Sequence, residues 1–300
     1  MGWSSPDSLI TRLFSGDPIA IFLAFLVTIS LPLLLHLYFY TQTARAKVVP
    51  NFLLLGPSGA GKTSLVSLLQ KRSSNPEDSE AALTRISQVS STVSLLLSAS
   101  VSLGSDKYRS ENDTSFKDKQ PTRYVMIDTP GHGKLRSEQA LSQIQNPALR
   151  GVIFVVDASA LDSSDSSSSR DTAVYLHDTL LALQRRKTGK NKARTEIPVL
   201  IAANKQDLFT ALPTGAVKER LQTEIERVRV SRSKGLTTVG QDPDSSADEE
   251  VLGGGGEEKF SFQLMQEEYD ISVDIVGGAV RGEEAGKGVR RWEEWIGSCL

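Results

Sequence analysis

The sequence is poor in cysteine and has no excess of positive charge. Cys299 is its only cysteine, so an intramolecular disulfide and a cysteine-built zinc or iron–sulfur site are excluded, which fits a reducing compartment. Lys and Arg total 34 against 36 Asp and Glu, a formal net charge of -2, so no basic field predicts direct binding of nucleic acid. The 300 residues are 39% hydrophobic and 23% charged, which excludes a wholly disordered or fibrous chain.

Charge is missing altogether between Pro18 and Ala44. Residues 19–40 are almost entirely apolar, and about 20 such residues in a helix are enough to cross a bilayer. The segment before them carries Asp7 and Asp17 rather than a basic cluster, and the run is too long for a cleaved secretory signal. We therefore predict one N-terminal transmembrane helix, a single-pass anchor in contact with membrane lipid.

The basic residues around this run predict its orientation. Arg12 alone precedes it, whereas Arg45 and Lys47 follow it, so the positive-inside rule places the C-terminal body in the cytosol. Two later stretches are rich in Ser, Asp, Gly and Glu and are expected to be solvated linkers, with phosphorylation of their serines as the alternative. The expected parts are a short lumenal N-terminus (1–18), the transmembrane helix (19–40), a tether (41–47) and a globular domain (48–300) with low-complexity inserts at about 162–170 and 231–259.

The globular part alternates short apolar runs with helical patterns. Buried strands are predicted at Val48 to Leu55, Arg123 to Ile127, Gly151 to Val156, Val199 to Ala203 and Tyr269 to Val276, with Thr92 to Val101 as an additional strand. Helices are predicted at about 62–71, 134–145, 172–186, 215–230 and 289–299. This alternation predicts an α/β fold, a mainly parallel sheet with helices on both faces.

The clearest motif, GxxxxGK[ST], lies where the first of these strands meets a helix. Its residues are Gly56, Pro57, Ser58, Gly59, Ala60, Gly61, Lys62 and Thr63, with Ser64 directly after them. Glycines let backbone N–H groups wrap the phosphates of a nucleotide, Lys62 supplies charge to the β and γ phosphates, and the Thr63 hydroxyl can bind Mg²⁺. The motif therefore predicts a P-loop that binds a nucleotide with Mg²⁺.

A second loop, DTPGH, follows another apolar run. Asp128 is expected at the carboxyl end of the sheet, where its carboxylate can hold Mg²⁺ through a water molecule. The Gly131 amide can approach a γ-phosphate without obstruction, so the loop is expected to order with a triphosphate and relax after hydrolysis. His132 can orient the attacking water or contact a partner, and both roles stay open.

The tetrapeptide NKQD follows the strand that ends at Ala203 and predicts the base. The Asp207 carboxylate can accept hydrogen bonds from the N1–H and the exocyclic amine of guanine, an arrangement that adenine does not offer. Asn204 is expected to support the pocket, and Lys205 to lay its aliphatic stem over the purine. The nucleotide is therefore predicted to be GTP or GDP.

These motifs, in this order, resemble the translation-factor-related P-loop GTPases. The membrane span, the DTPGH and NKQD loops and the final Trp292-Glu-Glu-Trp295 resemble, more narrowly, the family of the signal recognition particle receptor beta subunit. That resemblance implies a GTPase of the endoplasmic reticulum membrane with a cytosolic GTPase domain. It also implies that the protein anchors the receptor alpha subunit and acts on the signal recognition particle and the ribosome only indirectly. No local sequence supplies an obvious arginine finger, so unaided hydrolysis is expected to be slow.

Two expected elements depart from the GTPase pattern. The threonine of switch I that completes Mg²⁺ binding is expected at Thr92, with Thr84 as the second choice. The fifth motif is represented by Gly277, Gly278 and Ala279, and a backbone amide at Ala279 is expected to contact guanine O6.

Three other functions compete with this interpretation. An Arf- or Sar-like trafficking GTPase with a permanent anchor has the same chemistry. A P-loop ATPase or nucleotide kinase is disfavoured by NKQD. A binding module that holds GTP without significant turnover would carry the same motifs.

Overall fold

The computed structural model divides the chain into two compact units, Met1–Val48 and Val49–Leu300. It describes residues 18–45, 49–75, 81–104, 121–161, 166–188, 196–238, 251–254, 259–282 and 286–300.

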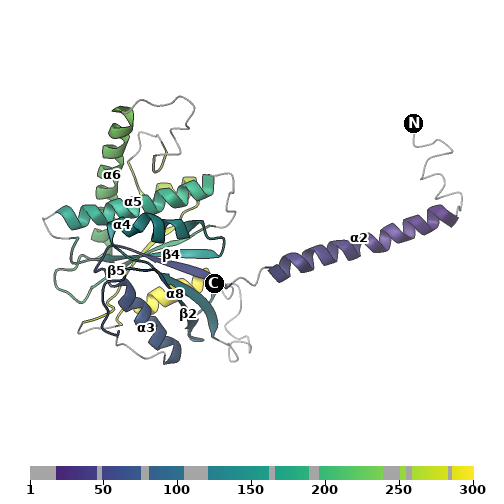
Figure 1. The fold of residues 1–300 in the computed structure, drawn as a ribbon, viewed down its shortest axis with the longest axis horizontal. Coiled ribbons are helices and arrows are strands. Elements are labelled where there is room, and N and C mark those ends of the chain that lie inside the picture. The colour runs from purple at the N-terminus through teal and green to yellow at the C-terminus, as the bar shows by residue number, and fades with distance from the viewer. Residues whose placement is uncertain are drawn as a thin grey trace. The chain divides into compact units, whose positions relative to one another are not determined.

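The first unit contains helix α2, Pro18–Arg45, with Pro32 inside it (Figure 1). The predicted span, residues 19–40, falls within this helix, whereas residues 1–17 and 46–48 lie outside the described part of the chain. Judged on the described residues alone, no helix of the structure is long and apolar enough to cross a membrane. The transmembrane anchor therefore stays a prediction.

The second unit is built on a six-stranded sheet with the order β2-β3-β1-β4-β5-β6. Neighbouring strands are parallel except for β2, which pairs antiparallel with β3. The strands are β1 (Asn51–Leu55), β2 (Ser91–Leu97), β3 (Thr122–Asp128), β4 (Leu149–Asp157), β5 (Val199–Asn204) and β6 (Val273–Gly277). The predicted α/β fold is thus confirmed as a mixed, mostly parallel sheet.

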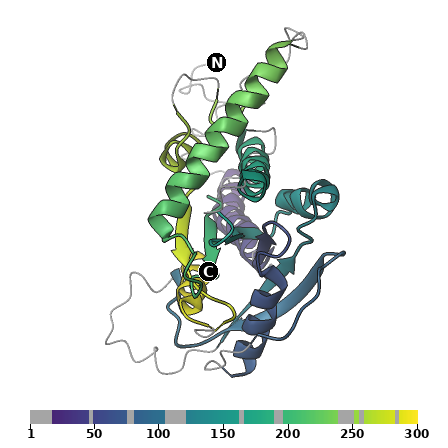
Figure 2. The ribbon, with the colours of Figure 1, turned by 90° about the vertical axis from the view of Figure 1, so that its left-hand side faces the viewer.

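Helices cover both faces of this sheet (Figures 1 and 2). Helices α3 (Lys62–Ser74) and α8 (Val289–Cys299) pack on one face. On the other face lie α5 (Ser166–Thr188), α6 (Thr214–Thr238), α7 (Phe262–Tyr269) and the short helical segment Gly133–Gln145, made of α4, η3 and η4. The helix predicted at 134–145 is therefore present, but as three short turns of different pitch.

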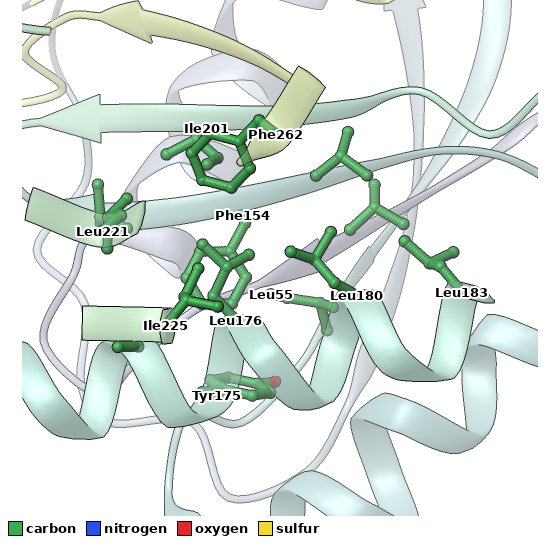
Figure 3. Close-up of a cluster of buried hydrophobic side chains, with 14 of the residues drawn as sticks. Leu55, Phe154, Tyr175, Leu176, Leu180, Leu183, Ile201, Leu221, Ile225 and Phe262 are labelled. Carbon is green, nitrogen blue, oxygen red and sulfur yellow. The ribbon is translucent and has the colours of Figure 1, made fainter. Parts of the chain in front are cut away.

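Strand β1 shows why the central strands of this sheet are apolar at consecutive positions. Phe52 and Leu54 point into the cluster under α3 and α8, whereas Leu53 and Leu55 point into the cluster under α5 and α6. Side chains alternate between the two faces of a strand, and both faces here are covered, so the four positions after Asn51 are all buried. Figure 3 shows Leu55 and Phe154 of the sheet beside α5.

One helix and the ends of the two inserts differ from the sequence-based expectation. Helix α7 was not predicted, and its last residue, Tyr269, was assigned to a strand that begins only at Val273. The Ser261 hydroxyl caps α7 by accepting a hydrogen bond from the Leu264 amide, a local signal that the short apolar pattern concealed. Helices α5 and α6 extend into the predicted inserts, to Ser166 and Thr238 respectively.

Part of the second insert also packs into the core, so the expectation of a solvated linker is wrong for residues 251–254. Leu252 is fully buried in the cluster under α5. The Gln184 side chain holds this turn by donating to the Val251 carbonyl at 3.0 Å and accepting from the Gly253 amide at 2.9 Å. A single apolar residue among glycines and acidic residues gave no periodic signal for this packing.

Candidate functional site

The P-loop connects β1 to the first turn of α3, and close contacts require its glycines. Gly56 has a φ of 137°, and a Cβ there would lie 2.2 Å from the Val155 carbonyl oxygen. Gly61 has a φ of 100°, and a Cβ there would lie 2.3 Å from the Asn204 Nδ2. Only glycine tolerates both a positive φ and so close an approach of neighbouring atoms. The loop therefore wraps the N-terminus of α3 as an anion-binding loop does.

Lys62 lies at the end of this loop, and its ammonium group contacts the backbone at the start of the loop. Its Nζ donates to the carbonyl oxygens of Gly56 and Pro57, both at 2.8 Å. Burial lowers the pKa of Lys62 to about 8, and the nearby Asp128 carboxylate partly opposes this shift. A bound phosphate would raise this pKa by adding negative charge beside the buried ammonium.

Thr63 and Asp128 form an oxygen site next to the P-loop. The Thr63 hydroxyl donates to Asp128 Oδ2 at 2.7 Å, whereas Asp128 Oδ1 is buried without a hydrogen-bond partner in the described part of the chain. Burial also raises the pKa of Asp128 against the opposing effects of Thr63 and Lys62. A hydroxyl and a carboxylate with an unused oxygen fit Mg²⁺, which takes one or two protein oxygens and completes its shell with phosphates and water.

A cavity of about 230 Å³ opens over the P-loop. Besides Ser58, Gly59, Lys62 and Thr63, it is lined by part of residues 81–90, which we call the switch I segment, and by the Gly131 backbone. A Cβ at Gly131 would lie 2.5 Å from the Ser58 amide nitrogen and 2.7 Å from Lys62 Nζ. The DTPGH loop therefore packs directly on the P-loop, where a terminal phosphate is expected.

The structure reverses the order of the two candidates for the switch I threonine. Thr92, the first choice, is exposed in β2 opposite Ile127 and is not among the described residues that line the cavity. Thr84, the second choice, lines the cavity and its Oγ1 lies 3.0 Å from the Ser64 hydroxyl. Strand pairing removes Thr92 from the site, so Thr84 becomes the candidate ligand for Mg²⁺.

Asn204, Lys205 and Asp207 of the NKQD motif line a second cavity of about 400 Å³, which shares Gly59, Gly61 and Ser64 with the first. Asn204 fixes its position, because its Nδ2 donates to the Ala60 carbonyl at 2.8 Å and its Oδ1 accepts from the Val280 amide at 3.1 Å. Lys205 has a φ of 65° and pairs with Asp157. Although burial alone would raise the pKa of Asp157, hydrogen bonds from Lys205 and Ser159 keep it below its usual range.

The fifth motif lies one to three residues later than expected. The Ala279 amide already donates to the Lys287 carbonyl at 2.8 Å, so it is not available to guanine O6. Val280, Arg281 and Gly282 line the cavity with Asp207 instead. Gly282 has a φ of 103°, and a Cβ there would lie 1.9 Å from Asp207 Oδ2, so a glycine is needed beside Asp207.

Two further side chains lie at or just after the DTPGH loop: an exposed histidine, and an arginine that the sequence analysis did not identify. His132 is exposed at the N-cap of α4. Arg136 donates through Nε to the Gly131 carbonyl at 3.0 Å, forms two hydrogen bonds to Asp171 of α5 at 2.9 and 2.6 Å, and lies 4.4 Å from the centre of the Tyr175 ring. Because Asp171 lies 35 residues away, no local pattern marked this pair.

Comparisons with known proteins agree with this geometry. A family model described as signal recognition particle receptor beta subunit matches residues 47–269. The signal recognition particle receptor subunit beta of Saccharomyces cerevisiae is 26% identical over 254 residues, which cover 84% of each chain.

Two solved structures from Chaetomium thermophilum are also similar. The signal recognition particle receptor SRb-GTP/SRX complex has a chain with 37% identity and a TM-score of 0.60, and the match covers 84% of this chain and 98% of that one. The SRb-GDP-Mg structure gives 36% identity and a TM-score of 0.59 with the same coverage. Since the family model spans most of the sequence, the chain belongs to the signal recognition particle receptor beta subunit family, whose members are small GTPases.

Proposed function

We propose that the protein binds GTP or GDP with Mg²⁺ and anchors the alpha subunit of the signal recognition particle receptor at the endoplasmic reticulum membrane. The observation that carries the nucleotide part is the position of Asn204, which joins the NKQD loop to the P-loop through Ala60 and to the following loop through Val280. Asp207 lines the second cavity, which shares Gly59, Gly61, Ser64 and Arg281 with the cavity over the P-loop, as a single nucleotide bound across both cavities would require.

Residues 19–40 would supply the membrane anchor. They carry no charged side chain, and α2 is helical through all of them. The basic residues that follow favour a GTPase domain on the cytosolic side, where a nascent-chain complex arrives.

The switch I segment supports a nucleotide-dependent partner surface. Leu83, Ile86 and Val89 are 96%, 75% and 70% exposed, in a segment without helix or strand that also lines the phosphate cavity. A γ-phosphate that orders this segment would fix the positions of these apolar side chains and so create a binding surface. The similar Chaetomium thermophilum protein was solved with SRX in its GTP form, which makes the receptor alpha subunit the favoured partner.

GTP hydrolysis, where it occurs, is expected to be slow. His132 is exposed and can orient a water only after the DTPGH loop closes over a γ-phosphate. Arg136, the basic residue four positions further on, is held by Asp171 and does not reach toward a transition state. A protein that holds GTP as a binding signal, without significant turnover, is the alternative.

The decisive experiment is to purify the full-length protein from microsomes in GTP and in GDP and to identify what is retained. Retention of the receptor alpha subunit in GTP but not in GDP is expected. Retention of vesicle-coat components instead would favour the Arf- or Sar-like alternative. Competition by ATP as strong as that by GTP would contradict the guanine site itself.

A further inference from the structure

We propose that Arg281 binds the α-phosphate of the nucleotide and ties it to the start of the switch I segment. This inference rests on the proposed guanine-nucleotide site. It assigns a role to a residue that lies outside the P-loop, DTPGH and NKQD motifs.

The position of Arg281 between the two cavities carries the inference. Gly59, Gly61, Ser64 and Arg281 line both the phosphate cavity and the base cavity. A nucleotide with its base at Asp207 and its terminal phosphates at Lys62 must pass along these shared residues, and the part that lies there is the ribose and the α-phosphate. Among the described residues that line both cavities, Arg281 has the one charged side chain. Its natural acceptor is the phosphate, because a guanidinium matches phosphate oxygens in charge and geometry.

The hydrogen bonds of Arg281 leave a donor for this phosphate. Its Nη2 donates to the Ala82 carbonyl in the switch I segment. Its Nε is buried and has no hydrogen-bond partner among the described residues. A buried donor without a partner is costly, and a guanidinium has enough N–H groups to hold a carbonyl and a phosphate together.

The loop that carries Arg281 is fixed on both sides. The preceding Val280 amide donates to Asn204, and the following Gly282 lies against Asp207. The guanidinium is therefore anchored to the base-binding loops while it reaches to switch I. Since GTP and GDP share the α-phosphate, this link is expected in both states, so the γ-phosphate acts on the part of switch I beyond Ala82.

The test compares Arg281→Gln, Arg281→Lys and the control Arg291→Gln in the full-length protein in detergent. Arg291 is an exposed arginine of α8 that lines neither nucleotide cavity in the described part of the chain. Affinities for GTP, GDP, GMP and guanosine are measured by competition against labelled GDP. Arg281→Gln is expected to weaken GTP, GDP and GMP by about tenfold each and to leave guanosine unchanged. Arg281→Lys keeps the charge but loses the planar set of donors, so its affinities for GTP, GDP and GMP are expected to fall between those of the wild type and of Arg281→Gln.

Several results would overturn the assignment. A loss confined to GTP and GDP would place Arg281 at the outer phosphates, and an equal loss for guanosine would make its role structural. Unchanged affinities would remove it from the site. Should Arg281→Gln fail to fold, Arg281→Lys decides, since a loss for GMP that matches the loss for guanosine contradicts phosphate binding.

A second measurement tests the link to switch I. Amide hydrogen exchange in residues 81–90 is expected to be faster in GDP-bound Arg281→Gln than in the wild type, and unchanged in Arg291→Gln. Equal protection in all three would refute the link. A wild-type protein that fails to bind GTP would instead contradict the proposed function, so the two failures are distinguishable.

Discussion

The nucleotide loops and the switch I segment meet at one cavity but are held in different ways. Side chains hydrogen-bonded to backbone fix the nucleotide loops, as Asn204 does with Ala60 and Val280. The switch I segment has no helix or strand between residues 81 and 90, and it presents apolar side chains to solvent. Segments with few buried contacts open and reorder at low free-energy cost. In the proposed function, this difference would separate recognition of the base, which needs rigid geometry, from signalling, which needs a segment that the γ-phosphate can reorganise.

The largest expected effect comes from removing the side chain that holds the nucleotide loops together. Asn204→Ala leaves the buried Ala60 carbonyl and Val280 amide unpaired, at a cost of about 1–3 kcal/mol for each group. GTP affinity and the free energy of unfolding are both expected to fall, as measured by competition and by denaturant unfolding.

Asn146→Ala is the matched control for this change. The Asn146 side chain accepts from the Ala148 amide at 2.9 Å in the turn before β4, outside both nucleotide cavities as described. Asn146→Ala is expected to lower the free energy of unfolding without changing GTP affinity. Equal loss of affinity in both variants would show that Asn204 has no special role in the site.

The next effect tests the choice of base. Asp207→Asn places an NH₂ donor against a donor of guanine, and an unpaired buried group costs about 1–3 kcal/mol. GTP affinity should fall roughly tenfold or more, at about 1.4 kcal/mol per decade. Xanthine has a carbonyl where guanine has its amine, so xanthosine triphosphate should then be preferred. A mutant that still prefers GTP in a competition assay would remove Asp207 from the base pocket.

The sequence predicted the rigid loops well because their signals are local. Strand β1, the glycines of the P-loop and the start of α3 are contiguous, so one short pattern predicts the strand, the loop and the helix together. The same is true of NKQD at the end of β5.

The residues that the sequence did not predict are placed by contacts between segments that are distant in the chain. Thr84 replaces Thr92 as the candidate because β2 pairs with β3 and withdraws Thr92. Arg281 lines the site only because its loop returns to Ala82, 199 residues away in the chain. Leu252 is buried in a turn that Gln184 holds through the backbone of Val251 and Gly253, and no periodic pattern predicts this packing. Long-range contacts of this kind leave no signature in a short window of sequence.

A smaller effect follows from the lowered pKa of Lys62. In the folded, nucleotide-free protein this pKa is about 8, below its value of 10.5 in the unfolded chain, so the unfolded state binds more protons between these values. Stability is therefore expected to rise with pH in that window, by about 1 kcal/mol between pH 7.5 and 9. Denaturant unfolding of the wild type and of Lys62→Met measures this, and the rise should be missing in the mutant. An equal rise in both would assign it to other groups.

The smallest expected effect on binding is that of His132→Ala. This variant tests whether the DTPGH loop belongs with the rigid nucleotide loops or with the switch I segment. The His132 side chain is exposed, and its backbone carbonyl, which accepts from the Leu135 amide at 2.9 Å, is retained in the mutant. GTP and GDP affinities should therefore stay within about twofold, less than 0.5 kcal/mol. Single-turnover hydrolysis should slow if the imidazole orients the attacking water, whereas alpha-subunit binding should weaken if it contacts the partner.

Thr63→Ala is the contrasting variant, because the loss of its hydroxyl removes an oxygen from the Mg²⁺ site and should weaken Mg²⁺-dependent binding. If both mutants lose GTP affinity to the same extent, His132 belongs with the rigid nucleotide loops and the division between the two regions fails at the DTPGH loop.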